Sequence, residues 1–442
     1  MRARLLLCII GIFMLSACSQ SPVEEFFRLP ELPQEFVEFN DQLSKIRTGG
    51  AELTAPLSGF NRQSVQLMDL DNDGVDEGVA FAIKKGEAKR AVMYVFKKQG
   101  DSYQVLGEIE GPGNLVDSVS YADVMGNGNY EIVIGWGLED NSARTLTAYE
   151  ITSDGMKKLL EVPYLYYVQA DMEGDGIADL GVIMPDEKNK SPEIALFSRG
   201  MGELRFRSAV ALSQGINQIK KIRAGYAADG VPAIFIDSAH NDKTTITDII
   251  VLKNGQLVNA MRNEESGISN LTVRNYQINC EDADGDGIIE VPSPAPFPGY
   301  DEENIATPLY GITWRRYNGT QELEDVSYTY HDYTDGWHIV LPLKWRGKIS
   351  AERMTQDRGV MFYGTDRNGE KILLFSVYVL MGESRYVKAT YSGRFQLTEK
   401  QNIIYAASVK KDSYSGIDIT EESLREMFRW RETEWSSGEV VA

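Results

Sequence analysis

Residues 69–77 read Asp-Leu-Asp-Asn-Asp-Gly-Val-Asp-Glu, and residues 78–83 continue as Gly-Val-Ala-Phe-Ala-Ile. Acidic segments of similar outline recur at 123–131, 171–179 and 282–290, each followed by apolar residues. The first aspartates of successive segments are 54, 48 and 111 residues apart. Because 111 is about twice 55, a unit of roughly 50 residues repeats, which is the length of a four-stranded propeller blade.

A further unit fills the longest interval, since residues 223–236 keep the outline but lack the acids. Short β-rich runs such as 91–96 and 193–197 occupy the rest of each unit. Such runs with regular turn signals are typical of a sandwich, barrel or propeller, and the period favours the propeller. We expect a mainly β fold with about five four-stranded blades over 49–329 and an insertion near 292–304. Whether five blades close, or the chain ends complete a sixth, stays open.

The acidic segments have the composition of loops that bind a hard cation. Ca²⁺ prefers several oxygen ligands, which carboxylates at loop positions 1, 3, 5 and 9 and the carbonyl at position 7 supply, while Gly at position 6 permits the bend. The sequence predicts about three structural Ca²⁺ sites, formed by Asp69, Asp71, Asp73, Val75 and Glu77, by Asp171, Glu173, Asp175, Ile177 and Asp179, and by Asp282, Asp284, Asp286, Ile288 and Glu290. The segment 123–131 has Met125 at position 3, so we expect weak binding or none there.

Two other interpretations of these segments are possible. An EF-hand requires Glu at position 12 and a following helix. Ala80, Val182 and Ser293 occupy that position, and mostly β-type residues follow, so the EF-hand is disfavoured. Alternatively, the acidic turns cap strands and stay hydrated without an ion. Three complete segments at regular spacing favour the metal.

These loops resemble the FG-GAP and VCBS repeats of propellers similar to integrin alpha chains. The resemblance covers about residues 50–325 and is specific only at the loops. It implies that a calcium loop joins two strands of a blade and that Ca²⁺ binds at the residues given above. The second and fourth repeats depart from this pattern.

The first residues have the order of an export signal. Met1-Arg-Ala-Arg4 is basic, residues 5–15 are apolar, and Leu15-Ser-Ala-Cys18 resembles the lipobox of bacterial lipoproteins. That resemblance implies cleavage after residue 17, lipidation of Cys18 and a membrane anchor on the extracytoplasmic face of the bacterial envelope. Residues 18–48 are then an acidic tether containing a short helix over 34–46. Cleavage removes Cys8 and lipidation uses Cys18, so Cys280 has no partner for an intrachain disulfide.

The pattern changes in residues 330–442, for which we expect a small α+β domain. Strands are predicted at several places, including 385–391 and 403–408, and a helix begins at Asp418 or Thr420 with an Asp-x-x-Glu capping box. Leu424, Met427 and Phe428 are expected on the buried face of that helix. This segment is loosely similar to PsbP-like domains, without a diagnostic motif.

Composition limits the functions open to this chain. A net charge of −20 argues against nucleic acid as a partner, because phosphate binding needs a basic surface. The three histidines lack metal-ligand spacing, and nucleophile-elbow, P-loop and dinucleotide motifs are absent from the sequence. Two hypotheses remain. One is a calcium-stabilised binding or scaffold module for a protein or glycan. The other is a polysaccharide hydrolase or lyase with a carboxylate pair in the propeller channel, and the lining of that channel discriminates between them.

Overall fold

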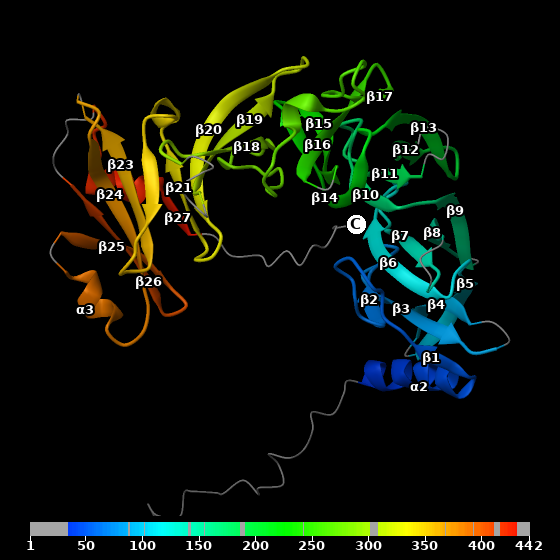
Figure 1. Cartoon of the computed structure of the whole chain (residues 1–442). Coiled ribbons are helices and arrows are strands. Elements are labelled where there is room, and N and C mark those ends of the chain that lie inside the picture. Colours follow the sequence, from blue (N-terminus) through cyan, green and yellow to red (C-terminus); the bar gives the residue numbers. More distant parts are fainter. Residues whose placement is uncertain are drawn as a thin grey trace, which may run out of the picture.

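The computed structural model describes residues 34–430 apart from 87–88, 101, 140–142, 154, 186–190, 242, 301–307, 367, 392 and 411–415. The predicted signal peptide, Cys18 and the first part of the tether lie outside these residues. Within them the chain forms six antiparallel sheets that follow one another along an arc (Figure 1). No helix in this described part is long and apolar enough to cross a membrane.

The first four sheets correspond to the first four predicted repeats. Sheet 1 contains β1 (Ala51–Leu53), β2 (Val65–Met68), β3 (Glu77–Lys84), β4 (Arg90–Gln99) and β5 (Ser102–Glu110). Sheet 2 contains β6 (Leu115–Ala122), β7 (Glu131–Gly137), β8 (Arg144–Thr152) and β9 (Gly155–Pro163). Sheet 3 contains β10 (Tyr166–Ala170), β11 (Asp179–Met184), β12 (Glu193–Arg199) and β13 (Leu204–Ala211). Sheet 4 contains β14 (Ile216–Ala228), β15 (Val231–His240), β16 (Thr244–Lys253) and β17 (Gln256–Asn259).

The last two sheets are built from the rest of the chain. Sheet 5 contains β18 (Val291–Pro296), β19 (Tyr310–Tyr317), β20 (Leu323–Asp332), β21 (Trp337–Leu341) and β27 (Phe428–Trp430). Sheet 6 contains β22 (Ser350–Arg353), β23 (Gly359–Thr365), β24 (Lys371–Leu380), β25 (Arg394–Lys400) and β26 (Ile403–Val409). The helices are α2 (Gln34–Thr48), α3 (Arg385–Ala389) and α4 (Glu421–Met427), with 3-10 turns η2 (Asn270–Thr272) and η3 (Leu343–Trp345).

Neighbouring sheets pack face to face, which explains why their central strands are apolar on both faces. In β3, Val79 and Phe81 pack toward sheet 2, whereas Ala80 and Ala82 face α2. Further clusters join sheet 2 to sheet 3, sheet 3 to sheet 4, sheet 4 to sheet 5 and sheet 5 to sheet 6. The core is therefore a series of layers between sheets.

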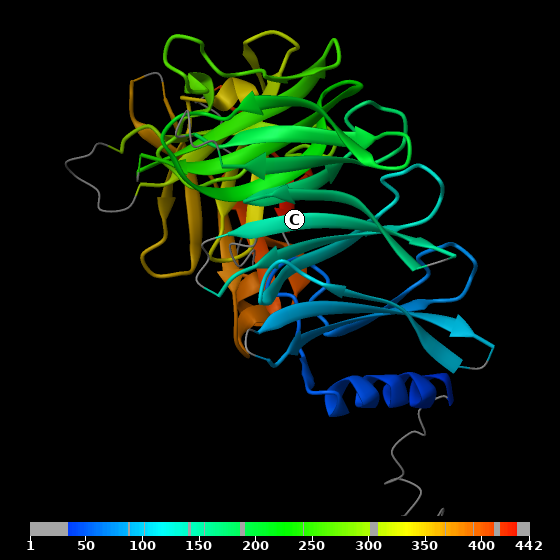
Figure 2. The same ribbon diagram turned by 90° about the vertical axis from the view of Figure 1, so that its right-hand side faces the viewer.

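Helix α2 covers the outer face of sheet 1, as Figure 2 shows from the side. The Phe39 ring is 4% exposed and packs edge-on against Phe96, with a centroid distance of 5.1 Å. Gly78 permits this approach, because a Cβ there would lie 2.6 Å from the Phe39 ring. The helix predicted over 34–46 is confirmed, and it buries an apolar face that would otherwise meet water.

The arrangement is propeller-like, but a closed ring is not observed among the described residues. Figure 1 shows a gap between sheet 6 and α2. Within the described residues no hydrophobic cluster joins sheet 6 to sheet 1, whose outer face α2 already occupies. The prediction of a mainly β fold with several four-stranded sheets is confirmed, whereas closure is not.

The chain after residue 329 is not set apart as the α+β domain that we expected. The expected boundary at 329/330 falls inside β20, and β27 returns to pair with β21 in sheet 5. Tyr330 and Trp337 of sheet 5 share one core with Phe362 and Phe375 of sheet 6. A separate small α+β domain is therefore not confirmed.

Several local predictions for residues 291–442 differ from the structure. Residues 385–389 form α3 rather than a strand. The capping box of α4 is formed by Thr420 and Ser423, because the Thr420 hydroxyl accepts the Ser423 N–H and the Ser423 hydroxyl accepts the Thr420 N–H. Residues 291–296, within the supposed insertion, form β18 and pair with β19.

Candidate functional site

The acidic segments form loops at equivalent places in the sheets. Loop 1 (69–77) connects β2 to β3, loop 2 (123–131) connects β6 to β7, and loop 3 (171–179) connects β10 to β11. Loop 4 (282–290) leads into β18 after the Glu281–Glu290 bridge. The corresponding connection in sheet 4 is a tight turn at Asp229-Gly230, which matches the loss of acids in that repeat.

The loops share one backbone conformation that explains their glycines. Position 6 has positive φ in every loop, from +82° at Gly176 to +87° at Gly287. Position 4 is also left-handed, and Asn72, whose φ is 56°, is the one non-glycine there. Because L side chains rarely adopt this region, Gly or Asn is required at both positions.

The first and last acids of each loop hold the turn through backbone hydrogen bonds. Asp69 accepts the Asp73 N–H at 3.1 Å through Oδ1 and the Gly74 N–H at 2.9 Å through Oδ2. Glu77 accepts the Leu70 N–H at 2.9 Å. The same bonds recur in the other loops through Asp123 and Glu131, Asp171 and Asp179, and Asp282 and Glu290. These acids therefore stabilise the turns as capping groups, with or without an ion.

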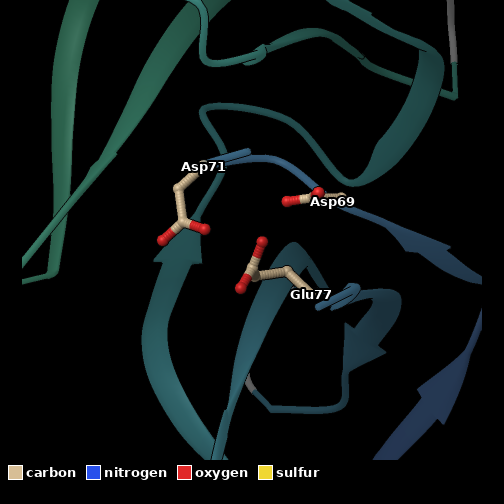
Figure 3. A group of neighbouring side chains, drawn as sticks. All are labelled: Asp69, Asp71 and Glu77. Carbon is tan, nitrogen blue, oxygen red and sulfur yellow. The ribbon is translucent and has the colours of Figure 1, made fainter. Parts of the chain in front are cut away.

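Loop 1 brings three carboxylates to a common space (Figure 3). One oxygen each of Asp69, Asp71 and Glu77 lie within 4.8 Å of one another. Glu77 is fully buried, and burial raises the pKa of its carboxyl. Among the described residues, Glu77 Oε1 and Asp71 Oδ1 have no hydrogen-bond partner. Such buried acceptors fit a divalent cation, which would supply the missing interaction.

Loop 4 repeats this geometry. One oxygen each of Asp282, Asp284 and Glu290 also lie within 4.8 Å of one another. Burial is the main cause that raises the pKa of Glu290 to about 7. Two of the three predicted sites are therefore acidic clusters that could hold a metal ion.

A basic side chain from the same sheet contacts each of these clusters. Lys97 of β4 forms ion pairs with Asp71, with Asp73 at 3.3 Å and with Glu77 at 3.8 Å. Arg316 of β19 contacts Glu290 at 3.1 Å and Asp284 at 3.8 Å. A bound Ca²⁺ would have to compete with these cations. The sequence did not predict Lys97 and Arg316 as partners of the loops, because strand pairing brings them there. One signal was present: Lys97 follows the first Asp of loop 1 by 28 residues, and Arg199, which contacts loop 3, follows the first Asp of that loop by the same number.

Loops 2 and 3 are organised differently. In loop 3, Arg199 contacts Asp175 at 3.1 Å and Arg207 contacts Glu173 at 3.8 Å, and its acids do not form a three-carboxylate cluster within the described residues. Its Ca²⁺ site stays a prediction. In loop 2, Met125 packs against the core between sheets 2 and 3 and offers no oxygen.

A second candidate site lies on the concave side of the arc, where β2, β6, β10 and β14 are the innermost strands (Figure 1). We call it the inner groove, and its volume is about 570 Å³. Its lining combines apolar, polar and basic side chains: Phe60, Asn61, Met68, Ser120, Tyr121, Val168, Gln169, Lys221, Ile222, Arg223, Ala224 and Ile289. Among these described lining residues there are two cations and no carboxylate. Met68 immediately precedes loop 1 and Ile289 belongs to loop 4, so the loops adjoin the groove.

Hydrogen bonds fix the polar part of the groove. Gln169 donates to Ser120 Oγ at 2.9 Å, and Ser120 also pairs with the Tyr167 hydroxyl at 2.9 Å. The Tyr121 hydroxyl donates to Gln66 at 2.6 Å, and burial raises the pKa of this phenol, so it stays protonated.

Comparison with known proteins assigns no family. No family model matches the chain, and no curated protein matches it. Among solved structures, the rhamnogalacturonan lyase YesW is similar with a TM-score of 0.32 at 13% identity, over 72% of this chain and 76% of that chain. A rhamnogalacturonan lyase of Bacillus licheniformis gives 0.31 at 11% identity over 80% and 91%. A Lactobacillus plantarum protein gives 0.29 at 11% over 72% and 85%. TM-scores this low do not assign a family or an activity to this chain.

Proposed function

We propose that this chain is an exported, lipid-anchored binding module that presents the inner groove to a protein or glycan. The observation that carries this proposal is the composition of the groove. Rigid strands from four sheets line it with apolar, amide, hydroxyl and cationic groups, a combination typical of ligand sites.

The same composition disfavours the hydrolase form of the enzymatic alternative. Hydrolysis of a glycosidic bond ordinarily requires two carboxyl groups about 5–9 Å apart, one of them acting as an acid. The described lining of the groove holds neither Asp nor Glu. The acids that do cluster lie in loops 1 and 4, where Glu77 and Glu290 cap their turns and form ion pairs with Lys97 and Arg316.

We further propose that Ca²⁺ binds at loops 1 and 4, and as a third site at loop 3, in a structural role. Coordination would tie positions 1, 3, 5 and 9 of a loop to the start of the next strand. Because Met68 and Ile289 line the groove beside loops 1 and 4, ions there would also fix its rim.

Binding and turnover can be separated with one filled-groove variant. Ala224 is exposed in the groove, so Ala224→Trp would occupy it; Gln104→Trp adds the same side chain to the outer strand β5. We expect the full-length protein and Gln104→Trp to be retarded in gels containing envelope or plant polysaccharides, with Ala224→Trp retarded less and no new reducing or unsaturated ends released. Release of such ends by the wild type, abolished in Ala224→Trp, would establish the enzyme instead.

The anchor has its own test. Cys18→Ser removes the predicted lipidation site, and Cys280→Ser is the control because Cys280 is buried in the body. We expect only Cys18→Ser to lose incorporation of labelled palmitate and to leave the membrane fraction. Equal labelling of both variants would contradict the anchor.

A further inference from the structure

The inner groove is positively charged in a strongly acidic protein. The chain carries 65 acidic and 45 basic side chains, yet the charged residues of the groove are Lys221 and Arg223. Both lie on β14, two positions apart, so they point to the same face of the strand. In a cleft, like charges from one strand focus their field on whatever enters.

Arg223 has capacity for a ligand. Its Nε is buried, and within the described residues it has no hydrogen-bond partner. Because Nε is out of contact with solvent, an anion entering the groove would meet the outer guanidinium nitrogens of Arg223 and form charge-assisted bonds with them. The planar guanidinium suits a carboxylate or phosphate, both of which offer two oxygens on one edge.

The rest of the groove offers contacts for a polyhydroxylated ring. Asn61, Ser120 and Gln169 are polar, half-buried and line the same space, so they can bond hydroxyl groups. The Ser120–Gln169 hydrogen bond holds two of them in place. Phe60 is 76% exposed although it is a large aromatic, and it offers a flat apolar face at the groove.

We propose that the inner groove binds a sugar that carries one anionic group, either a carboxylate or a phosphate, with the anion on Arg223 and Lys221 and the ring beside Phe60. This inference rests on the proposed function as a binding module and names the chemical class of its ligand.

Isothermal titration of the full-length protein with four probes tests the proposal: glucuronate, glucose 6-phosphate, glucose and inorganic phosphate. We expect an anionic sugar to bind at least about tenfold more tightly than glucose, because charge-assisted bonds are lost with the neutral ring. Tighter binding of glucuronate identifies the carboxylate as the preferred group, and tighter binding of glucose 6-phosphate identifies the phosphate. Inorganic phosphate should bind more weakly than either sugar.

Two charge-matched variants locate the site. Arg223→Gln removes one positive charge from the groove. Lys220→Gln removes one from a position of β14 that is next to Lys221 but does not line the groove. We expect Arg223→Gln to weaken the anionic sugar about tenfold and to leave glucose unchanged, and Lys220→Gln to change neither. The circular dichroism spectrum should be that of the wild type in both variants.

Three results would overturn the proposal: equal affinity for glucose and for both anionic sugars, equal effects of the two variants, or no binding of any probe. Equal affinity for neutral and anionic sugars, lost in Ala224→Trp, would reject the anionic ligand while leaving the binding module in place. Turnover of a polysaccharide would instead reject the binding module itself.

Discussion

Glu77, Glu131 and Glu290 occupy position 9 of their loops and are all fully buried. In each, one carboxyl oxygen accepts the N–H of loop position 2. The spacing of acids in the sequence predicted Glu77 and Glu290 as ligands, and the structure shows that all three glutamates cap their turns. The sequence could not reveal Lys97 and Arg316, because their approach depends on strand pairing over more than twenty residues. At the scale of single residues, the carboxylates were therefore predictable and their internal counter-charges were not.

The pH dependence of stability should reveal the buried Glu131. Burial is the main cause that raises its pKa to about 7 in the folded chain, from 4.5. Its contribution to stability is therefore present below pH 4.5 and is lost as pH rises through about 7, a change on the order of 3 kcal/mol. We expect Glu131→Gln to lose less stability than the wild type between pH 5 and 8, measured by urea unfolding. The exposed Glu139→Gln is the control, and identical pH profiles for wild type and Glu131→Gln would contradict this role.

Arg316 should oppose Ca²⁺ at loop 4. Without Arg316, the ion would no longer displace a positive charge from Asp284 and Glu290. We expect Arg316→Gln to bind Ca²⁺ about two- to fivefold more tightly, since partly exposed ion pairs contribute about 0.2–1 kcal/mol. With EGTA the same variant should melt below the wild type, because the acids have lost their counter-charge. Arg205→Gln, whose partner Glu203 lies outside the loops, serves as control; weaker Ca²⁺ binding by Arg316→Gln would show that Arg316 does not compete.

Strands were predicted correctly from the sequence where a loop is followed by an apolar run. The period identified five of the six sheets, because an acidic loop or a Gly turn precedes β3, β7, β11, β15 and β18. Prediction was wrong at α3, where Tyr386 and Val387 favour strands locally but the short segment between β24 and β25 is helical. Phe428, expected on the buried face of a helix, lies in β27 instead. Its strand is defined by pairing with β21, more than eighty residues earlier, which local patterns do not encode.

Helix α2 is the element whose contribution is most easily measured. Phe39 of α2 packs its ring against the rings of Phe96 and Tyr103 in sheet 1. We expect Phe39→Ala to reduce the free energy of unfolding by about 3–5 kcal/mol, as for other buried aromatic truncations. Phe60→Ala is the matched control, because its ring is 76% exposed and should change stability by less than about 0.5 kcal/mol. Equal effects of the two changes would show that α2 is not docked on sheet 1 in solution.

The molecule as a whole is a stack of sheets with covered outer faces. Length and period predicted a propeller-like body. They could not show that α2 would cover the outer face of sheet 1, which would have to contact the last sheet in a closed ring. Open arcs need such caps, because an uncovered apolar sheet face would associate with other chains. The inner groove, likewise, collects residues from five repeats and has no local sequence signature. The curvature of the arc brings these residues together, and the sequence does not encode that curvature in any local pattern.

Thermal unfolding of the full-length protein with and without Ca²⁺, combined with titration of bound ions, tests the central claim that the acidic loops are calcium sites. At millimolar Ca²⁺ we expect two to three ions per chain and a melting temperature roughly 5 °C above that in EGTA. Asp284→Ala should bind one ion fewer, and Met125→Asp, which supplies the oxygen missing at position 3 of loop 2, should bind one more. Unchanged melting in EGTA, with no ions bound to the wild type, would show that the loops are capped turns held by their own hydrogen bonds and ion pairs.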